Sequence, residues 1–385
     1  MVAELAMNYA SFMIRRTRLE KNWSQEGLCR EICTASYLSK IEQGKAEPSE
    51  EILRLLFARL GICWNGSEEG SGPVQEGYDL LFSGEKQLLE ALVGSEGFLK
   101  WENSPLGLDC MLLRRCAENG PALDRELEML MEPVQLALQR LLQELWEEAI
   151  GLCPCSYTYY GAGFACYHKG DFAHAVEYMY RAVDLASEEG RVRIMLMART
   201  IMGNCYANLN DLVSMQRHYT AAGRLARALG DEEVLQEIRY NTAATCIEAG
   251  RYEEAMAYFQ TQRDSDSRIV LHKLAVCCEK LGRRSEGLAA LDRAEGLPDH
   301  SAEGLESRMC RTVRLRLTDP EYLDSEAYGK TLTETFDLCR RYAPVGYCLF
   351  HMPWMIEWYE HHRQYKQVAA LMMEFPEFHK NYRFK

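Results

Sequence analysis

The sequence predicts an all-α protein in which a small helix-turn-helix bundle precedes a long α-solenoid of helical repeats. Three observations support this prediction. Apolar residues recur at spacings of three and four through almost every segment, and only 11 prolines and 27 glycines interrupt 385 residues. The N-terminal part contains short helices in close succession. Further along the chain, turn residues at 170, 210, 250 and 282 recur at intervals of 40, 40 and 32 residues, which indicates a repeat.

Composition and charge limit the classes of protein to consider. Hydrophobic residues make up 47% and charged residues 26% of the chain, which is ordinary globular usage and argues against disorder. Residues 1–66 hold nine Lys plus Arg against eight Asp plus Glu, a balance of +1, so a net charge of −13 leaves −14 for the remainder. An acidic body with a neutral head is compatible with nucleic-acid binding by the head alone.

The cysteine content favours a cytoplasmic location. Fifteen cysteines in so long a chain, without a charged-then-apolar leader, indicate a reduced compartment rather than a disulfide framework. No apolar run approaches the roughly 18 residues that a membrane span needs. We expect translation to start at Met1 or Met7.

Residues 1–65 are expected to form the first domain, with four short helices between residues 8 and 62. Ser24 and Ser49 are good N-caps, because a serine hydroxyl can accept a hydrogen bond from a free backbone N–H in the first turn of a helix. Apolar residues at helical spacing predict one small core: Leu28, Ile32, Leu38, Ile41, Leu53, Leu56 and Leu60.

A motif for DNA recognition lies inside this domain. Ser24-Gln25 opens one helix, Thr34-Ala35-Ser36 opens the next, and Ile41-Glu42-Gln43-Gly44 closes it. This pattern resembles the helix-turn-helix of the XRE class, to which Cro and phage repressors belong. Ile32 stands where many members of this class have glycine. In such a pair the second helix enters the major groove. The resemblance implies base-facing or phosphate-facing roles for Gln25, Thr34, Ala35, Ser36, Tyr37, Ser39 and Lys40, and the margins offer Arg16, Arg18, Gln43 and Lys45 for phosphates.

Residues 66–76 have the Gly, Ser and Pro content of a linker, and residues 77–385 are expected to form the repeat domain for sensing and dimerisation. Pro105 and Gly120-Pro121 break the helices before residue 150. Four tetratricopeptide-like units follow around the turns, a degenerate unit is expected at 305–342, and a terminal one near 354–372.

The first helix of each hairpin lines the inner face of such an array. Counting from the turns predicts that this face carries aromatic and amide side chains, which suit an extended peptide. The candidate peptide-binding residues are Tyr157, Tyr160, Phe164, Tyr167, His168, Thr200, Asn204, Asn208, Tyr240, Asn241 and Glu248, with Ala244, His272, Val276, Glu279 and Lys280 also on this face. Several of these aromatic residues are equally compatible with packing between helices.

The arrangement of head, spacer and repeats resembles RRNPP-type regulators of Gram-positive bacteria. The resemblance implies a homodimer on a two-fold DNA operator and a short signalling peptide in the repeats, as in quorum sensing. It also implies that Asn204, Asn208 and Asn241 hold the peptide backbone. Two alternatives stay open: the repeats bind a protein partner, or they serve only for dimerisation.

Other chemistry finds little support in the sequence. Cys153-Pro154-Cys155 and Cys277-Cys278 do not complete a four-ligand zinc set, and the adjacent pair His361-His362 points apart on a helix. No phosphate loop, nucleophile elbow or metalloprotease helix occurs. We therefore expect neither an enzyme nor a metal or cofactor.

Overall fold

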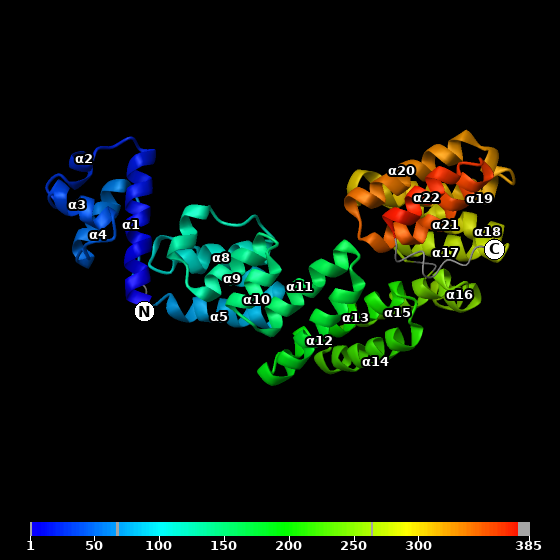
Figure 1. Ribbon diagram of the computed structural model, residues 1–385, viewed down its shortest axis with the longest axis horizontal. Helices are drawn as coiled ribbons and strands as arrows, with labels where there is room; N and C mark the ends of the chain where they lie inside the picture. The colour runs from blue at the N-terminus through cyan, green and yellow to red at the C-terminus, as the bar shows by residue number, and fades with distance from the viewer. Residues whose placement is uncertain (1, 67–68, 263–264, 376–385) are drawn as a thin grey trace. The chain divides into compact units, whose positions relative to one another are not determined.

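The computed structural model describes residues 2–66, 69–262 and 265–375, and every regular element in these ranges is a helix (Figure 1). The all-α prediction is thus confirmed. The chain divides into two compact units, the first of Met1–Ala162 with Tyr180–Met195 and the second of Gly163–Met179 with Leu196–Lys385. No helix in the described ranges is both long and apolar enough to cross a membrane.

The N-terminal bundle consists of α1 (Val2–Glu20), α2 (Gln25–Cys29), α3 (Ala35–Glu42) and α4 (Glu50–Leu60). Ser24, Thr34 and Ser49 cap the last three helices, and each hydroxyl accepts a hydrogen bond from the backbone N–H three residues on. The buried core between the helices consists of Ala10, Ile14, Leu28, Cys29, Leu38, Ile41, Leu53, Leu56, Phe57 and Leu60. Because side chains of all four helices meet there, the core fixes which face of α3 points outward.

A second group of helices follows in the first unit. It consists of α5 (Ser71–Ser83), α6 (Lys86–Val93), α7 (Glu96–Leu99), η1 (Lys100–Asn103), α8 (Gly107–Glu118), η2 (Arg125–Leu130), α9 (Pro133–Leu142) and α10 (Trp146–Leu152). The predicted breaks at Pro105 and Gly120-Pro121 fall between η1 and α8 and between α8 and η2.

The bundle is fastened to this group through α1. The Tyr9 ring packs in a small core with Leu108 of α8 and Leu127 of η2, and its hydroxyl donates to the backbone oxygen of Glu102 at 3.3 Å. Gly107 makes the approach possible, because a Cβ there would lie 2.5 Å from the Tyr9 ring. The two groups of helices therefore share a packed contact.

The predicted linker over 66–76 is wrong from residue 71 onward, because α5 begins at Ser71. Val74 and Gly77 of this helix are buried, and apolar contact with neighbouring helices offsets the cost of ordering a Gly-rich segment. The preceding residues are also anchored, since the Asn65 amide donates to the Lys100 backbone oxygen at 2.7 Å. Residues 67 and 68 of the expected linker lie outside the described residues.

The rest of the chain forms helical hairpins. Their helices are α11 (Ser156–Lys169), α12 (Phe172–Glu189), α13 (Val192–Asn208), α14 (Leu212–Leu229), α15 (Glu232–Glu248), α16 (Tyr252–Thr261), α17 (Arg268–Lys280), α18 (Arg284–Glu295), α19 (Leu305–Thr318), α20 (Glu326–Tyr342), α21 (Val345–His361) and α22 (Tyr365–Glu374), with the short turns η3 (Ala302–Gly304) and η4 (Tyr322–Asp324). The degenerate unit expected at 305–342 corresponds to α19 and α20, and the terminal one to α21 and α22.

The predicted turns are confirmed by their backbone conformation. Gly170, Asn210, Gly250 and Gly282 all adopt positive φ, between 57° and 81°. A single left-handed residue reverses the chain after each first helix, and glycine or asparagine adopts this conformation at the lowest cost. Asn210 is therefore the substitute for glycine that the 40-residue spacing predicts at this turn.

Close packing inside one hairpin depends on a missing side chain. Gly203 of α13 lies against Tyr219 of α14, and a Cβ on Gly203 would lie 2.2 Å from the tyrosine ring. Tyr219 is 2% exposed, and its ring occupies the space that a larger residue at 203 would fill. This contact carries the Tyr219 hydroxyl across to the neighbouring residue Asn204.

Candidate DNA-binding helix and inner polar cluster

The exposed side of α3 is the candidate for base recognition. Ser36 and Lys40 are exposed, and Thr34 at the N-cap is exposed as well, whereas Leu38 and Ile41 are fully buried on the other side. The helix therefore presents a short polar face whose orientation is fixed from behind by the core. Such a face suits a helix that lies in the major groove with its N-terminal residues against the bases.

The prediction that Arg18 contacts phosphate is wrong, because this side chain does not reach the surface. Its Nε and Nη2 donate to the two carboxylate oxygens of Glu42 at 2.6 and 2.9 Å, and Nη1 donates to the Trp23 backbone oxygen at 2.8 Å. Arg18 is 8% exposed and Glu42 is likewise 8% exposed. Its donors are already used inside the bundle, so Arg18 joins α1 to α3 instead of binding phosphate.

Gln25 takes part in the same buried network. Its amide donates to Glu42 Oε2 at 2.7 Å. The side chain is only half-buried, but its amide nitrogen is directed toward the carboxylate and not outward. Gln25 could therefore contact DNA only through its side-chain carbonyl oxygen or through its backbone N–H in the first turn of α2.

The remaining predicted DNA-binding residues are partly or fully accessible. The Tyr37 hydroxyl donates to the Glu47 backbone oxygen at 3.0 Å, which orients the ring along the loop after α3. Gln43 donates to Ser39 at 3.0 Å and accepts from Lys45 at 2.9 Å, and all three contacts are exposed. Ala35 is half-buried. Exposed contacts of this kind are weak, so DNA can replace them.

Arg16 is exposed but lies on the side of α1 that contacts η2. Its Nε pairs with Glu20 and its Nη1 with Asp124, each at 3.0 Å. Both carboxylates are more than half exposed, which makes these ion pairs cheap to break. Its role at phosphate stays a prediction.

The turn between α2 and α3 departs from the expected position by one residue. Glu31 has a φ of 64°, so it adopts the left-handed conformation, whereas Ile32 does not. Ile32 instead packs against the bundle core. The resemblance predicts a left-handed glycine position at 32, but the left-handed residue of this turn is at 31. The exposed Glu31 adopts this conformation at a cost of about 1–2 kcal/mol.

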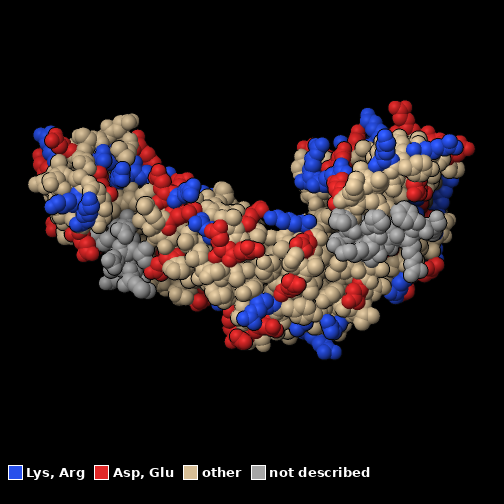
Figure 2. All heavy atoms as spheres, viewed as in Figure 1, with Lys and Arg blue, Asp and Glu red and all other residues tan. Residues whose placement is uncertain are grey.

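Charge on the head is mixed. Figure 2 shows basic and acidic side chains next to one another on the visible face of the N-terminal bundle, without a continuous basic surface. This agrees with the balance of +1 for residues 1–66 that follows from nine basic and eight acidic residues. Attraction to phosphate is therefore modest, and recognition depends on a small docking surface.

In the second unit, an inner polar cluster forms around Asn204 of α13. Asn204 Oδ1 accepts hydrogen bonds from Tyr219 Oη at 2.6 Å and from Asn241 Nδ2 at 3.2 Å. Asn241 Nδ2 also lies 3.3 Å from Glu237 Oε1. We call these four residues, Asn204, Tyr219, Glu237 and Asn241, the inner polar cluster. It joins the first helices of two successive hairpins, α13 and α15.

The cluster divides the predicted asparagines into two kinds. Asn204 is 9% exposed, and both lone pairs of its side-chain oxygen are used, so it is a buried junction. Asn208 and Asn241 are half-buried, and their amide nitrogens are engaged. Among the described residues, none donates to the side-chain oxygen of Asn208 or of Asn241. These two oxygens remain available for a backbone N–H of a ligand.

Two acidic residues of α15 lie in this region. Glu237 and Glu248 both have exposed surface, and burial by the surrounding protein raises the pKa of each carboxyl above its usual range.

Sequence reasoning missed several residues of this region. Glu237 stands one helical turn before Asn241, and this spacing would have identified it. Tyr219 lies on a second helix of a hairpin, which the rule about inner faces excludes. Lys273 is 7% exposed with its ammonium over the Phe350 ring, and burial lowers its pKa, opposed by the Glu248 carboxylate. Phe350 belongs to α21, in a part of the sequence too irregular to align.

Other predicted peptide-binding residues have structural roles. Thr200 is 5% exposed and its hydroxyl donates to the Leu196 backbone oxygen within α13. Tyr157 packs edge-on against Phe82 of α5, with ring centroids 5.6 Å apart. The prediction for Thr200 is wrong, because a helix in a layered array contacts neighbours on more sides than the inner face alone. Tyr157 is half-buried, and its role in peptide binding stays a prediction. His272 is also fully buried.

The aromatic residues near the end of α11 do lie together. Phe164 and His168 pack edge to face with centroids 4.3 Å apart, and His168 also meets Tyr167 at 5.4 Å. Phe164 is 39% exposed. The Tyr240 ring packs edge-on against Phe259 and is half-buried, which is the interhelix packing that the sequence left open. Tyr160 is half-buried on α11.

Metal binding finds no support in the described ranges. Within them, no group of three or more His, Cys, Asp or Glu side chains could hold a metal ion.

Comparisons with known proteins agree with this architecture. Residues 14–62 match the helix-turn-helix family, and residues 156–189 match the tetratricopeptide repeat family. No curated protein matches the chain. A Rap protein solved in complex with competence and sporulation factor is similar over 82% of this chain and 98% of its own, with 15% identity and a TM-score of 0.53.

A second solved structure, Bacillus thuringiensis PlcR in complex with the peptide PapR7 and DNA, shares 17% identity over 81% of this chain and 99% of its own. Its TM-score of 0.32 is too low to carry an argument about the fold. The chain therefore combines a helix-turn-helix head with tetratricopeptide-like repeats and has a fold similar to that of the Rap protein.

Proposed function

We propose that this protein is a sequence-specific DNA-binding transcriptional regulator whose helical repeats bind a short signalling peptide, as in quorum sensing. It acts in the cytoplasm as a homodimer and has no catalytic role. The observation that carries this proposal is α3, whose polar face with Ser36 and Lys40 is exposed while its opposite face is locked into the bundle.

The peptide half of the proposal depends on the inner polar cluster. Asn208 and Asn241 each keep a side-chain oxygen free of donors from the described residues, and Glu237 lies beside Asn241 with a carboxyl whose pKa is raised by burial. Amide oxygens at successive turns of adjacent helices can accept from the N–H groups of an extended backbone. The Rap protein of similar fold, solved with competence and sporulation factor, supports ligand binding by repeats of this type.

Regulation follows from the way in which peptide binding redistributes conformations. Residues of α13 and α15 contact one another through the inner polar cluster, so a ligand held by both helices favours one angle between successive hairpins. In a homodimer, a change in that angle would alter the separation of two heads, which must match half-sites about one DNA turn apart.

Two experiments test the two halves. For DNA, selection from a random duplex library followed by sequencing should yield one two-fold motif, and enrichment of no motif would refute sequence-specific binding. For the ligand, genome-encoded short peptides are screened for a thermal shift, because a ligand of the folded state raises apparent stability. A saturating peptide should also change the solution scattering profile. If a protein partner, and no peptide, stabilises the chain, the peptide half is wrong while the DNA half stands.

A further inference from the structure

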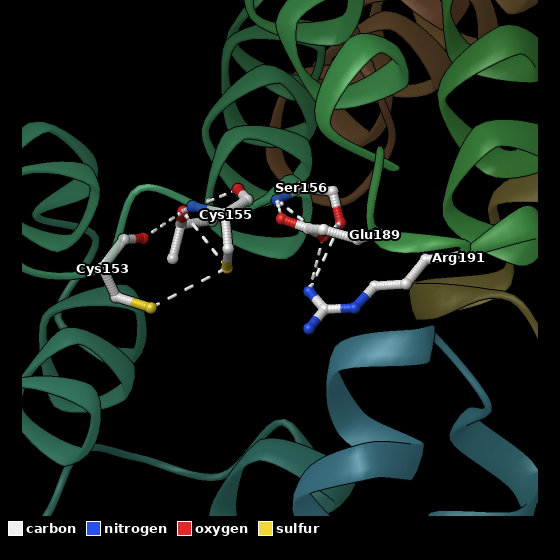
Figure 3. A network of polar contacts seen from close by, with 6 residues as sticks. Cys153, Cys155, Ser156, Glu189 and Arg191 are labelled. Carbon is white, nitrogen blue, oxygen red and sulfur yellow. Dashed lines mark hydrogen bonds and ion pairs between the residues drawn. The ribbon is translucent and has the colours of Figure 1, made fainter. Parts of the chain in front are cut away.

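A pair of cysteines lies at the joint between α10 and α11. Cys153 is the C-cap of α10, Cys155 immediately precedes α11, and Pro154 separates them. Figure 3 shows both sulfur atoms on the same side of this short connection. Both residues are partly exposed.

The backbone brings the two thiols together before any reaction. The Cys155 N–H donates to the Cys153 backbone oxygen at 3.0 Å, which closes a three-residue turn around Pro154. Proline fixes its own φ and so removes freedom from this turn. The Sγ atoms are 3.9 Å apart, with the Cys153 thiol directed at the Cys155 sulfur. To reach the length of a disulfide bond, about 2.05 Å, the two sulfur atoms would have to approach each other further.

Groups around Cys155 favour its thiolate. The Cys153 thiol and the backbone N–H groups of Thr158 and Tyr157 lower its pKa to about 6 despite opposition from burial. The two N–H groups belong to the first turn of α11, where the helix dipole favours negative charge. The pKa of Cys153 is raised instead, because its thiol donates to Cys155 and is partly buried. Glu189 also raises this pKa, whereas Arg191 lowers it.

No other cysteine has this environment. All fifteen lie in the described residues, and wherever the pKa of another thiol is shifted, it is raised. Cys277 and Cys278 are adjacent in sequence but fully buried. Cys63 is exposed but single, so it offers a matched reference for an ordinary surface thiol.

We propose that Cys153 and Cys155 form an oxidation site at which a hydroperoxide converts the dithiol into an intramolecular disulfide. The Cys155 thiolate attacks one peroxide oxygen, the O–O bond breaks, and the leaving hydroxide or alkoxide takes up a proton. The resulting sulfenic acid at Cys155 is then attacked by Cys153 sulfur, which loses its proton as the S–O bond breaks and water leaves. Two thiols are oxidised by two electrons, and one peroxide is reduced.

The position of the pair gives the modification a local structural effect. The Thr158 hydroxyl donates to the Cys153 backbone oxygen at 2.7 Å, and the next residue, Ser156, binds Glu189 through its N–H at 3.2 Å. Glu189 in turn pairs with Arg191 at 2.8 Å, as Figure 3 shows. Bringing the sulfurs to bonding distance therefore acts on the contacts that anchor the first turn of α11 to the turn after α12.

The test uses the reduced full-length protein and one equivalent of hydrogen peroxide near neutral pH. Free thiols are alkylated at intervals, and trypsin releases residues 141–169, which contain Cys153, Cys155 and Cys166. Tandem mass spectrometry should show loss of two hydrogens confined to Cys153 and Cys155, about tenfold faster than oxidation of Cys63. Oxidation of Cys63 at an equal or higher rate would overturn the proposal.

Three variants separate the roles. Cys153→Ser should stop at a sulfenic acid on Cys155 that a dimedone probe traps, because no resolving thiol remains. Cys155→Ser should reduce oxidation of Cys153 to the rate of Cys63. Thr158→Val should slow disulfide formation at about pH 6 and at about pH 8 alike, because it removes the hydroxyl that holds the Cys153 backbone oxygen, while leaving Cys63 unchanged. Oxidation of Cys155→Ser as fast as the natural chain, or Thr158→Val without effect at either pH, would contradict the assignment.

Discussion

Glu42 on α3 receives both arms of the Arg18 guanidinium from α1, at 2.6 and 2.9 Å. The pair is buried and shares its carboxylate with Gln25, so three helices of the head meet at one charged group. Truncation of one partner leaves an unpaired charge inside the bundle. Arg18→Ala should therefore lower the stability of the head by about 3–5 kcal/mol.

Thermal unfolding followed by circular dichroism measures this loss. Arg16→Ala is the matched control, because its ion pairs are exposed and each is worth at most about 1 kcal/mol. The opposite result would be an Arg18→Ala variant that melts like the natural chain and only binds DNA more weakly, with a smaller salt dependence. Arg18 would then contact phosphate and would not stabilise the bundle through Glu42.

Lys40 is the exposed cation on α3 and should contribute directly to DNA affinity. Lys40→Ala should weaken binding to the selected operator without changing the melting temperature. If Lys40 contacts phosphate, the slope of log affinity against log salt should fall by about 1. Fluorescence anisotropy over a salt series measures both quantities. Lys86→Ala, on α6, is the control, and an equal loss of affinity there would indicate non-specific attraction.

Asn241 should contribute to peptide binding through its free side-chain oxygen. Asn241→Ala removes the hydrogen bond that we propose to the peptide, together with the Nδ2 contacts to Asn204 and Glu237. Loss of the bond to the peptide corresponds to about tenfold weaker affinity for the peptide found by thermal shift. Isothermal titration calorimetry measures the change. Val213→Ala lies on α14 at a residue that is 82% exposed and should bind normally. Unchanged affinity of Asn241→Ala would place the peptide elsewhere on the chain.

His272 should make the second unit sensitive to acid. It is fully buried, neither ring nitrogen has a hydrogen-bond partner among the described residues, and burial lowers its pKa well below 6.5. Because the unfolded chain binds the proton more readily, this group reduces stability as pH falls below about 6.5. His351, whose pKa burial lowers to about 4, acts in the same direction.

His272→Leu should therefore narrow the difference in melting temperature between about pH 7.5 and about pH 5, and should raise stability by about 1 kcal/mol at the lower pH. Differential scanning fluorimetry measures both. His174→Ala is the control: Asp171 raises the pKa of this exposed ring, so its contribution is present below about 6.5 and disappears as pH rises. A pH difference unchanged in His272→Leu would mean that other groups dominate.

Gly203 should tolerate no side chain. Gly203→Ala places a Cβ 2.2 Å from the Tyr219 ring, and overpacking of this kind costs about 1–3 kcal/mol. The displaced tyrosine would also lose its hydrogen bond to Asn204. Gly223→Ala in the next helix is the control, since its nearest neighbour would be 3.5 Å away. Equal melting temperatures for the two variants would contradict the packing described.

The sequence predicted the features that local chemistry determines. Helix starts at Ser24, Thr34 and Ser49, and turns at Gly170, Asn210, Gly250 and Gly282, depend on one residue and its near neighbours, and the structure contains them all. The burial of individual side chains depends on partners far along the chain. Arg18 was assigned to the surface because its partner Glu42 is 24 residues away.

The same limit applies to the candidate peptide site. Counting residues from a turn gives the face of a helix but not the depth of a side chain, so Asn204 and Thr200 were placed at the surface although both are buried. Tyr219 joined the inner polar cluster only because Gly203 left room for it, and no periodicity reveals a contact between two hairpin helices at that level. The prediction of a linker at 66–76 is wrong from residue 71 onward for a related reason. Composition does not show that Val74 is buried against other helices.

The Tyr9 ring packs against Gly107, and its hydroxyl donates to the Glu102 backbone oxygen. These contacts hold α1 of the N-terminal bundle against α8. A rotation of α8 would therefore act directly on α1, the helix whose Arg18 holds Glu42 of α3.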